Sequence, residues 1–196
     1  MPTAVSPGKE LGPLHPYLFW GILALPVIAI VFWGRIFGGN PGYLRHTGLM
    51  GCWLLIAALA VTPLGMMFGP TVWVRWLRAN RRYLGVASFG YTLLHLAVFM
   101  VKTNLTRFIA TFTRYEILLG WLGFAVMLAM AITSNDRSVR TLGLNWKRLQ
   151  RWVYLGAALV LAHWVLSEKN YREVAIYTAP LILLMIWRLL RRRTTA

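Results

Sequence analysis

The chain has 196 residues, of which 58% are hydrophobic and only 13% are charged, and its mean hydropathy is +0.58. Soluble domains usually carry about 45–50% apolar and about 25% charged residues, and a single core of this size cannot bury so much apolar surface. The formal net charge of +16 comes from Lys and Arg scattered between long apolar runs. This pattern indicates an integral membrane protein in contact with lipid and excludes a general nucleic-acid binder.

Six apolar segments predict an all-α fold built as a bundle of six transmembrane helices. In chain order they cover 17–37, 47–68, 83–101, 117–132, 152–166 and 174–190. Most of them reach the roughly 17–25 residues that a helix needs to cross the bilayer, and the fifth does so if residues 149–151 form its first turn. The predicted domains are an N-terminal tail over 1–16, one transmembrane domain over 17–190 and a basic tail over 191–196.

The remaining stretches of the chain are short. The N-terminal 16 residues carry no signal-peptide pattern, so the first apolar segment is expected to be retained as a helix. The longest hydrophilic connection, over 133–147, is too short to fold alone. No internal repeat or soluble domain is detectable.

The distribution of Lys and Arg predicts that both termini lie in the cytoplasm. With six spans and a cytoplasmic N-terminus, fourteen of the 21 Lys and Arg fall on the cytoplasmic side and seven on the outer side. Cytoplasmic loops of membrane proteins carry such an excess of positive charge. The seven outer residues are Arg35, Arg45, Lys102, Arg107, Arg114, Lys169 and Arg172.

The acidic residues argue against a proton relay or an ion-coupled transporter, because all of them are expected at helix ends or in loops. They are Glu10, Glu116, Asp136, Glu168 and Glu173. The sequence has no phosphate-binding loop, nucleophile elbow or zinc-type Cys/His cluster. The single Cys52 excludes an internal disulfide and the C-x-x-C-H attachment of a c-type haem. The chemistry of the chain is therefore expected at its histidines.

Two of the four histidines are expected inside apolar helices, whereas His15 lies in the tail and His46 at the outer edge of the second segment. Measured from the cytoplasmic ends of their segments, His95 comes after roughly 18 Å of helix and His163 after roughly 21 Å. Two imidazoles on separate helices at one level suit the axial ligation of a b-type haem iron. The alternative is that each is a hydrogen-bonded packing residue.

A haem also needs a slot lined by small and aromatic side chains, and each intramembrane histidine shares its helix face with such residues. Ser88 and Tyr91 lie on the face of the first histidine, and Gly156 and Leu159 lie on the face of the second. We expect these four residues to border the slot.

A set of short motifs from residue 44 to residue 193 is similar to a known family. The motifs include His46-Thr47-Gly48, Thr62-Pro63-Leu64, Arg81-Arg82-Tyr83-Leu84-Gly85, Tyr91-Thr92-Leu93-Leu94-His95-Leu96, Thr133-Ser134-Asn135 and Ala162-His163-Trp164. In this order and spacing, the chain resembles the haem-binding membrane subunits of bacterial periplasmic methionine sulfoxide reductase systems, in the ferric-reductase-like transmembrane superfamily.

The resemblance implies a multi-pass protein of the bacterial inner membrane that binds haem b, with FMN as a further cofactor, and matches His95 and His163 with the family's haem ligands. Electrons would come from the quinone pool or a cytosolic flavin reductase and pass outward to a periplasmic molybdopterin-containing methionine sulfoxide reductase. That partner repairs oxidised proteins, so this chain would be an electron-transfer subunit without substrate chemistry of its own.

One departure from the superfamily pattern bears on the number of haems. Members with two stacked haems use a second pair of histidines on the same two helices, where this chain has Gln150 and Arg82. Neither side chain is a credible iron ligand, so one haem is expected. His46 is expected near the outer surface. Its role stays open between a substitute iron ligand, a proton donor and a capping residue.

Arg78, Arg82, Gln150 and Arg151 are expected near the cytoplasmic ends of the third and fifth segments, where they form a candidate inner site for a flavin or quinone. Arginine offers several donors to phosphate or carbonyl oxygens. The alternative is that these arginines only set the topology and contact anionic lipid. On the outer side, the basic residues expected to neutralise haem propionates or to contact the periplasmic partner protein are Arg45, Lys102, Arg107 and Arg114.

Two other functions stay open at this stage. The same haem would serve a metal-ion or quinone reductase. A small transporter or assembly factor without haem, whose histidines merely pack, is the alternative from another class.

Overall fold

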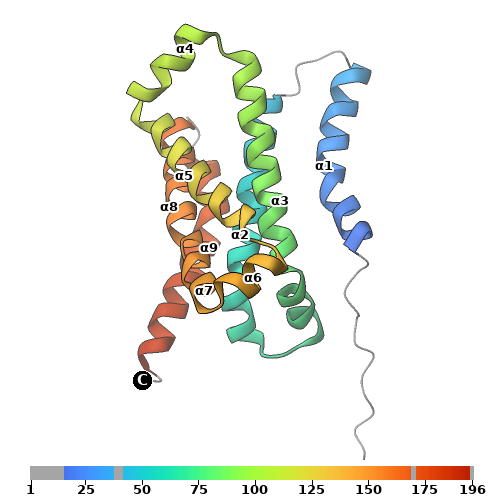
Figure 1. Cartoon of the computed structure of the whole chain (residues 1–196), viewed down its shortest axis with the longest axis vertical. Helices are drawn as coiled ribbons and strands as arrows, with labels where there is room; N and C mark the ends of the chain where they lie inside the picture. The colour runs from blue at the N-terminus through green and yellow to red at the C-terminus, as the bar shows by residue number, and fades with distance from the viewer. Residues whose placement is uncertain (1–15, 38–41, 169–170, 195–196) are drawn as a thin grey trace, which may run out of the picture.

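The computed structural model describes residues 16–37, 42–168 and 171–194, and this part of the chain is helical without a strand (Figure 1). The helices are α1 (Pro16–Phe37), α2 (Tyr43–Phe68), α3 (Val72–Lys102), α4 (Leu105–Ala110), the short 3₁₀ turn η1 (Thr111–Thr113), α5 (Tyr115–Ile132), α6 (Asp136–Leu142), α7 (Leu144–Gln150), α8 (Val153–Ser167) and α9 (Tyr171–Thr194). The tail with His15 lies outside the described residues. The predicted basic tail begins inside α9.

Among the described residues, five stretches are long and apolar enough to cross a membrane: α2, α3, α5, α9 and the continuous stretch Leu144–Ser167, which contains α7 and α8. Helix α1 contributes a shorter apolar stretch, Leu18–Ile30. The all-α, multi-pass prediction is therefore confirmed, and each of the six predicted segments corresponds to a separate helix.

The third helix begins earlier than predicted, at Val72 rather than near residue 83. Its first turns carry Arg75, Arg78 and Arg81, while Val74, directly before the first of them, is buried. Hydropathy marks where a helix enters apolar surroundings, and amphipathic turns before that point are polar on average. These arginines, predicted for a cytoplasmic rim between segments, therefore sit on a helix.

The hydrophilic connection between α5 and α8 forms the short helices α6 and α7 instead of an open loop. The side chain of Asn135 accepts a hydrogen bond of 2.8 Å from the Ser138 N–H and so caps α6. Arg82 of α3 forms an ion pair of 2.5 Å with Asp136. The Arg82 guanidinium beside Asp136 holds the pKa of that carboxyl below its usual value. The contact is therefore present at neutral pH and is lost as the pH falls through this lowered pKa.

Small residues let the helices approach one another closely in two pairs, α2 with α3 and α5 with α8. Ser88 of α3 is fully buried, and its hydroxyl donates a hydrogen bond of 2.7 Å to the carbonyl of Gly51 on α2. In the second pair, a Cβ atom added at Gly156 would lie only 3.1 Å from Val126. Close approach over small residues is the usual way in which membrane helices associate.

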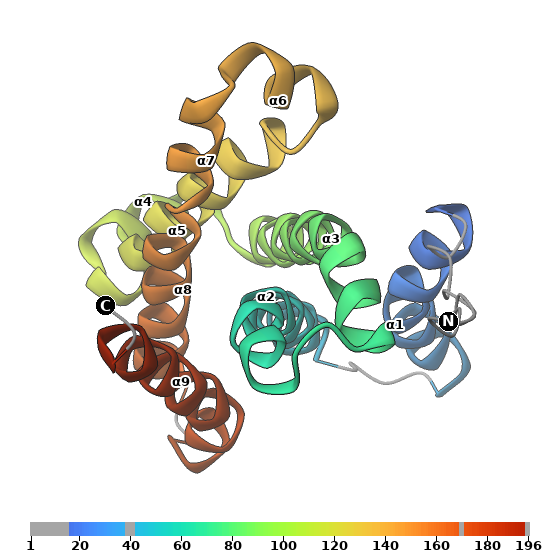
Figure 2. The same cartoon turned by 90° about the horizontal axis from the view of Figure 1, so that it is seen from below.

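The α2–α3 pair and the α5–α8 pair face each other, and the other two long helices, α1 and α9, lie on the outside of these pairs (Figure 2). Helix α9 packs along α2, and α1 lies on the far side of α3. The hydroxyl of Tyr91 on α3 donates to the carbonyl of Leu23 on α1 over 2.7 Å, and Phe19 packs edge-on against Trp76 and Tyr83. Helix α1 begins and α9 ends at the same end of the molecule (Figure 1).

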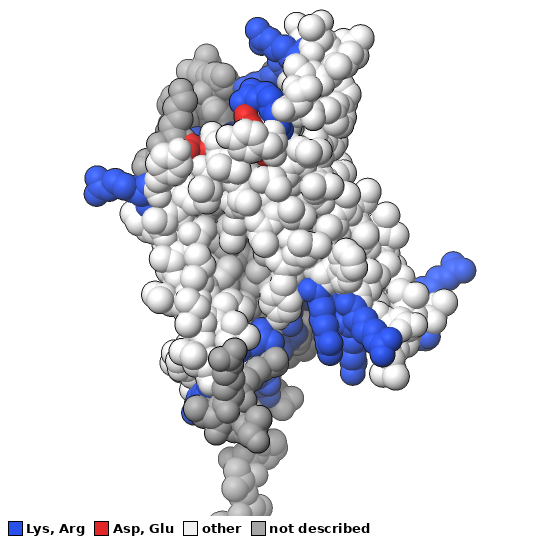
Figure 3. Space-filling view, turned by 90° about the vertical axis from the view of Figure 1, so that its left-hand side faces the viewer, with Lys and Arg blue, Asp and Glu red and all other residues white. Residues whose placement is uncertain are grey.

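Charged side chains lie at two levels on the molecular surface, separated by an uncharged band (Figure 3). Large apolar residues are exposed on the outside of the bundle, and Ile176 and Leu183 of α9 are each 66% exposed. A soluble protein of this size does not expose apolar surface so widely. The band is therefore the surface that meets the lipid chains.

Candidate functional site

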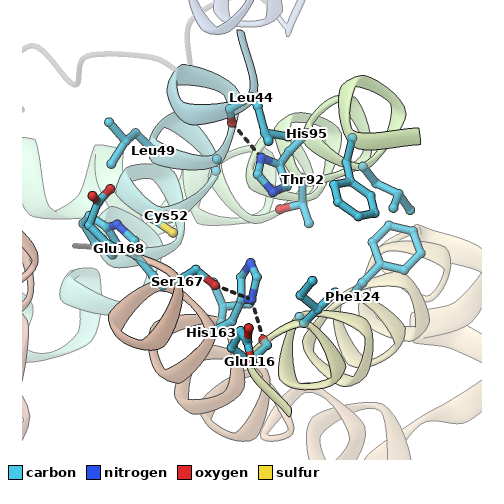
Figure 4. Close-up of a pocket in the computed structure, with 18 of the residues that line it drawn as sticks. Leu44, Leu49, Cys52, Thr92, His95, Glu116, Phe124, His163, Ser167 and Glu168 are labelled. Atoms are coloured by element: carbon cyan, nitrogen blue, oxygen red, sulfur yellow. Dashed lines mark hydrogen bonds between the residues drawn. The ribbon is translucent and has the colours of Figure 1, made fainter. Parts of the chain in front are cut away.

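A cavity of about 710 Å³ lies between the α2–α3 pair and the α5–α8 pair (Figure 4). Its lining is mostly apolar and includes Leu55, Leu96, Phe99, Phe124 and Val160. The volume falls within the range of about 300–1,000 Å³ that is typical of ligand and cofactor sites. Both histidines predicted inside the membrane line this cavity.

His95, on α3, is held against the first turns of α2. Its Nδ1 atom lies 2.8 Å from the carbonyl oxygen of Leu44. The ring packs on Gly48, one turn further along α2, where an added Cβ atom would lie 2.9 Å from Nδ1 and 3.1 Å from Cε1. The histidine therefore reaches the backbone of α2 because no side chain stands at position 48.

His163, on α8, is held against α5 in the same manner. Its Nδ1 atom lies 2.7 Å from the carbonyl oxygen of Glu116, and its ring packs on Gly120, where an added Cβ atom would lie 3.0 Å from Nδ1. The hydroxyl of Ser167 is a second neighbour of this Nδ1 atom, at 3.3 Å. The first histidine has no counterpart of this serine contact among its described hydrogen bonds.

These contacts determine the tautomer of both imidazoles. A carbonyl oxygen can only accept a hydrogen bond, so Nδ1 carries a proton in each ring, and Nε2 is the nitrogen that holds the lone pair in the neutral form of the imidazole. The two rings point toward one another across the cavity in Figure 4. Anchoring one ring nitrogen and freeing the other is how proteins orient imidazole ligands of metals. The cavity therefore presents two pre-oriented imidazole nitrogens.

The two helix pairs thus hold their histidines by one arrangement, a carbonyl and a glycine four residues apart on the neighbouring helix. Sequence reasoning missed this correspondence and detected no repeat. The signal available was a glycine five residues after the first residue of both α2 and α5, which is too weak to recognise without the structure.

The small and aromatic residues expected to border the slot have other roles. Ser88 bonds to α2, Tyr91 bonds to α1, and Gly156 packs against Val126. These residues face neighbouring helices and, with Leu159, are not among those that line the cavity. The prediction was wrong. Residues seven positions apart share a helix face but lie two turns apart along the helix, and a different helix lies opposite them there.

Charged residues surround the outer mouth of the cavity. Arg45 forms an ion pair with Glu173 and lies 3.7 Å from Glu168. These two contacts connect α2 to the end of α8 and to the start of α9. Arg114 pairs with Glu116 at 2.5 Å. Sequence reasoning placed these arginines on the outer side but gave no indication of these pairings, which join residues as far apart as positions 45 and 173.

Within residues 16–37, 42–168 and 171–194, no group of three or more His, Cys, Asp or Glu side chains is placed to hold a metal ion. The site therefore offers two imidazole nitrogens on opposite sides of a large apolar cavity, with ion-paired arginines at its mouth. A free metal ion needs more ligands than this, whereas a planar metal complex that brings its own equatorial ligands needs only two.

The relatives of this chain agree with such a site. The family model described as "Ferric reductase like transmembrane component" matches residues 47–161, more than half of the chain. The "Protein-methionine-sulfoxide reductase heme-binding subunit MsrQ" of Rhizobium meliloti is 34% identical over 193 residues, which cover 92% of this chain and 87% of that protein. The chain belongs to the MsrQ family of ferric-reductase-like transmembrane proteins.

Other MsrQ proteins are similar at the same level. Those of Brucella ovis and Brucella canis are each 36% identical over 151 residues, which cover 73% of this chain and 66% of theirs. No solved structure matches the chain. The family resemblance predicted from the motifs is confirmed.

In this MsrQ-family chain, His46 stands apart from the cavity. It lies in the first turn of α2 with its side chain exposed, and its Nδ1 atom is 3.2 Å from the carbonyl of Gly42 on the same helix. It is not among the residues that line the cavity. This placement is that of an exposed residue at the start of a helix.

The four residues of the candidate inner site lie on three different parts of the fold. Arg78 packs on α2, where an added Cβ atom at Gly65 would lie 2.2 Å from its guanidinium, and Arg82 points to α6 instead. Gln150 ends α7 with a buried side-chain nitrogen that has no partner, and Arg151 follows it directly. The inner site therefore stays a prediction.

Proposed function

We propose that this MsrQ-family protein is a b-type cytochrome subunit of the inner membrane, which passes electrons outward to a periplasmic, molybdopterin-containing methionine sulfoxide reductase. The observation that carries the proposal is the pair of imidazoles with protonated Nδ1 and free Nε2 that line one cavity. The relatives at 34–36% identity bear the name of heme-binding subunits of that reductase.

The residues present suit haem b held by His95 and His163. The cavity is mostly apolar and large enough for a cofactor, and the Nδ1 contacts of both histidines leave their Nε2 atoms for an iron ion. Arg45 and Arg114 at its mouth, which are ion-paired with Glu173 and Glu116 in this structure, would exchange these partners to bind the propionate groups. When bound there, the haem iron would supply one-electron chemistry, and the chain would orient it and exclude water.

The proposed topology has six spans and both termini in the cytoplasm. The excess of Lys and Arg on one side supports it, as does the arrangement in Figure 1, where α1 begins and α9 ends at one end. The cavity mouth with Arg45 and Arg114 then faces the periplasm. Electrons would leave on this side, where the reductase partner lies.

An absorption spectrum of the purified protein, oxidised and then reduced with dithionite, tests the proposal against a haem-free transporter or assembly factor. We expect a Soret band that shifts on reduction and a sharp α band, because two imidazoles make the iron low-spin. A featureless visible region in protein expressed with adequate haem would overturn the proposal.

The haem content should be close to one haem per chain. Arg82 and Gln150 stand where a second haem would need histidines, and Arg82 is engaged with Asp136. The pyridine haemochrome method, referred to protein mass, measures the ratio. A reproducible ratio near two would contradict the prediction and would make His46 the first ligand to examine.

Electrons that enter from the cytoplasm need a carrier in the inner half, since His95 and His163 lie roughly 20 Å from the cytoplasmic side by helix rise. We propose that a quinone or a flavin such as FMN occupies that region near Arg78, Arg82, Gln150 and Arg151. The unpartnered nitrogen of Gln150 is a hydrogen-bond donor available to such a ring carbonyl.

Replacing Arg82 or Arg151 by Gln should therefore slow haem reduction by the physiological donor about tenfold. Removing one charge-assisted hydrogen bond costs roughly 1.5 kcal/mol or more. Reduction by dithionite and the haem spectrum should stay unchanged. Stopped-flow measurements in proteoliposomes give these rates.

Two controls separate binding from structure. Arg137→Gln removes the same charge from the first turn of α6 and should change nothing, whereas Asp136→Asn breaks the ion pair but keeps Arg82. Wild-type rates in both the Arg82 and the Arg151 variant would mean that these arginines only set the topology.

A further inference from the structure

The two histidines are held in position by backbone carbonyl groups, which no substitution of a side chain can remove. The Nδ1 atoms bond to carbonyls of α2 and α5, and a change of side chain at Leu44 or Glu116 leaves those carbonyls in place. What lets the rings reach the carbonyls is the missing side chain one turn further along each helix. The adjustable part of each anchor is therefore a glycine.

The space at these glycines is fully used by the imidazole rings. A Cβ atom at Gly48 would lie 2.9 Å from Nδ1 and 3.1 Å from Cε1 of His95, and one at Gly120 would lie 3.0 Å and 3.2 Å from the same atoms of His163. Carbon and nitrogen atoms in van der Waals contact keep about 3.5 Å apart. Even a single methyl group at either position would force the ring away from its helix.

Such a displacement has a defined direction. The neighbouring helix backbone closes one side of each ring and the cavity lies on the other, so the ring can only move into the cavity. Moving it lengthens the Nδ1–carbonyl bond of 2.7–2.8 Å and carries Nε2 with it. The glycine thus determines how far each imidazole is drawn back and which tautomer it keeps.

We infer that Gly48 and Gly120 are positioning residues that set the tautomer of the two imidazoles and the space between their Nε2 atoms. The inference rests on the proposed function in taking that space as the haem site. Because one arrangement recurs in two helix pairs, replacement of either glycine should have the same consequence. A general packing role would not single out these two positions.

The chain offers matched controls for this idea. Gly123, one turn beyond Gly120 on α5, is as tightly packed, with a Cβ position 3.0 Å from Val160, but it touches no histidine. Gly85 on α3 has open space around its Cβ position. Gly123→Ala therefore reports the cost of crowding a helix contact, and Gly85→Ala reports the effect of alanine alone.

The first measurement compares haem affinity and spin state in the full-length wild type, Gly48→Ala, Gly120→Ala, Gly123→Ala and Gly85→Ala proteins. Disturbing a group that orients a metal ligand typically costs about 10- to 100-fold in affinity. We expect this loss, with a high-spin fraction in the absorption and EPR spectra, for Gly48→Ala and Gly120→Ala only. Equal losses in Gly123→Ala and Gly120→Ala would overturn the inference.

The second measurement does not depend on haem. Side-chain nitrogen NMR of the haem-free, ¹⁵N-histidine-labelled chain should show Nδ1-protonated tautomers for both histidines, assigned from His95→Gln and His163→Gln proteins. Gly48→Ala should abolish this state for His95 and Gly120→Ala for His163, with Gly123→Ala unchanged. Unaltered tautomers in both variants would overturn the inference. If the tautomers change in the two glycine variants but the wild-type protein binds no haem, the role of the glycines is upheld and the proposed function is refuted.

Discussion

Replacing His95 or His163 by alanine should leave a protein that either loses haem or holds it with a high-spin, five-coordinate iron. The two imidazoles are the histidine side chains among the described residues that line the cavity, and removing one opens a coordination position. The expected change is the largest of any single substitution, with loss of most of the bound haem. Haem content and the EPR spectrum of the purified variants measure it.

His46→Ala is the matched control, since it removes an exposed imidazole at the start of α2. It should keep wild-type haem content and a low-spin iron. Low-spin spectra in both the His95 and the His163 variants would show that the ligands are wrongly assigned. Loss of haem in the His46 variant alone would make that residue a ligand.

Ser88→Leu should be the most damaging substitution away from the histidines. Ser88 has no exposed surface, and its hydroxyl lies 2.7 Å from the carbonyl of Gly51, so α2 and α3 approach closely here. Overpacking such a contact costs roughly 1–3 kcal/mol. It would also move α2, with the carbonyl of Leu44, away from His95. We expect lower stability in detergent together with loss of haem.

Ser88→Ala keeps the small volume and removes only the hydroxyl. Its cost should be about 1 kcal/mol, with haem content retained, because Gly51 keeps its place in α2. Thermal unfolding followed by circular dichroism, and by the Soret band, separates the two variants. A Ser88→Leu protein as stable and as haem-rich as Ser88→Ala would contradict the packing argument.

The positions of the intramembrane histidines could be predicted from the sequence because the bilayer gives all helices a common reference level. Helix rise then places His95 and His163 at one depth without knowledge of the packing. The start of α3 at Val72 could not be read in this way, since hydropathy averages over the amphipathic turns that precede the apolar run.

The anchors of the histidines could not be predicted, because they depend on the register of two packed helices. Nothing local distinguishes Gly48 and Gly120 from Gly85, which has open space around it. The pairing of Arg45 with Glu173 likewise joins distant parts of the chain. Contacts of this kind follow from the tertiary structure, and single-sequence patterns carry no information about them.

The most direct test of haem ligation by two imidazoles is the hyperfine spectrum of the oxidised protein. Electron–nuclear double resonance on the full-length chain, with natural or ¹⁵N-labelled histidine, detects each histidine nitrogen bound to the iron. The account predicts couplings from two histidine nitrogens, of which one disappears in His95→Gly protein supplied with free, unlabelled imidazole and the other in the equivalent His163→Gly protein. Coupling to one histidine nitrogen only, or to none, would contradict it.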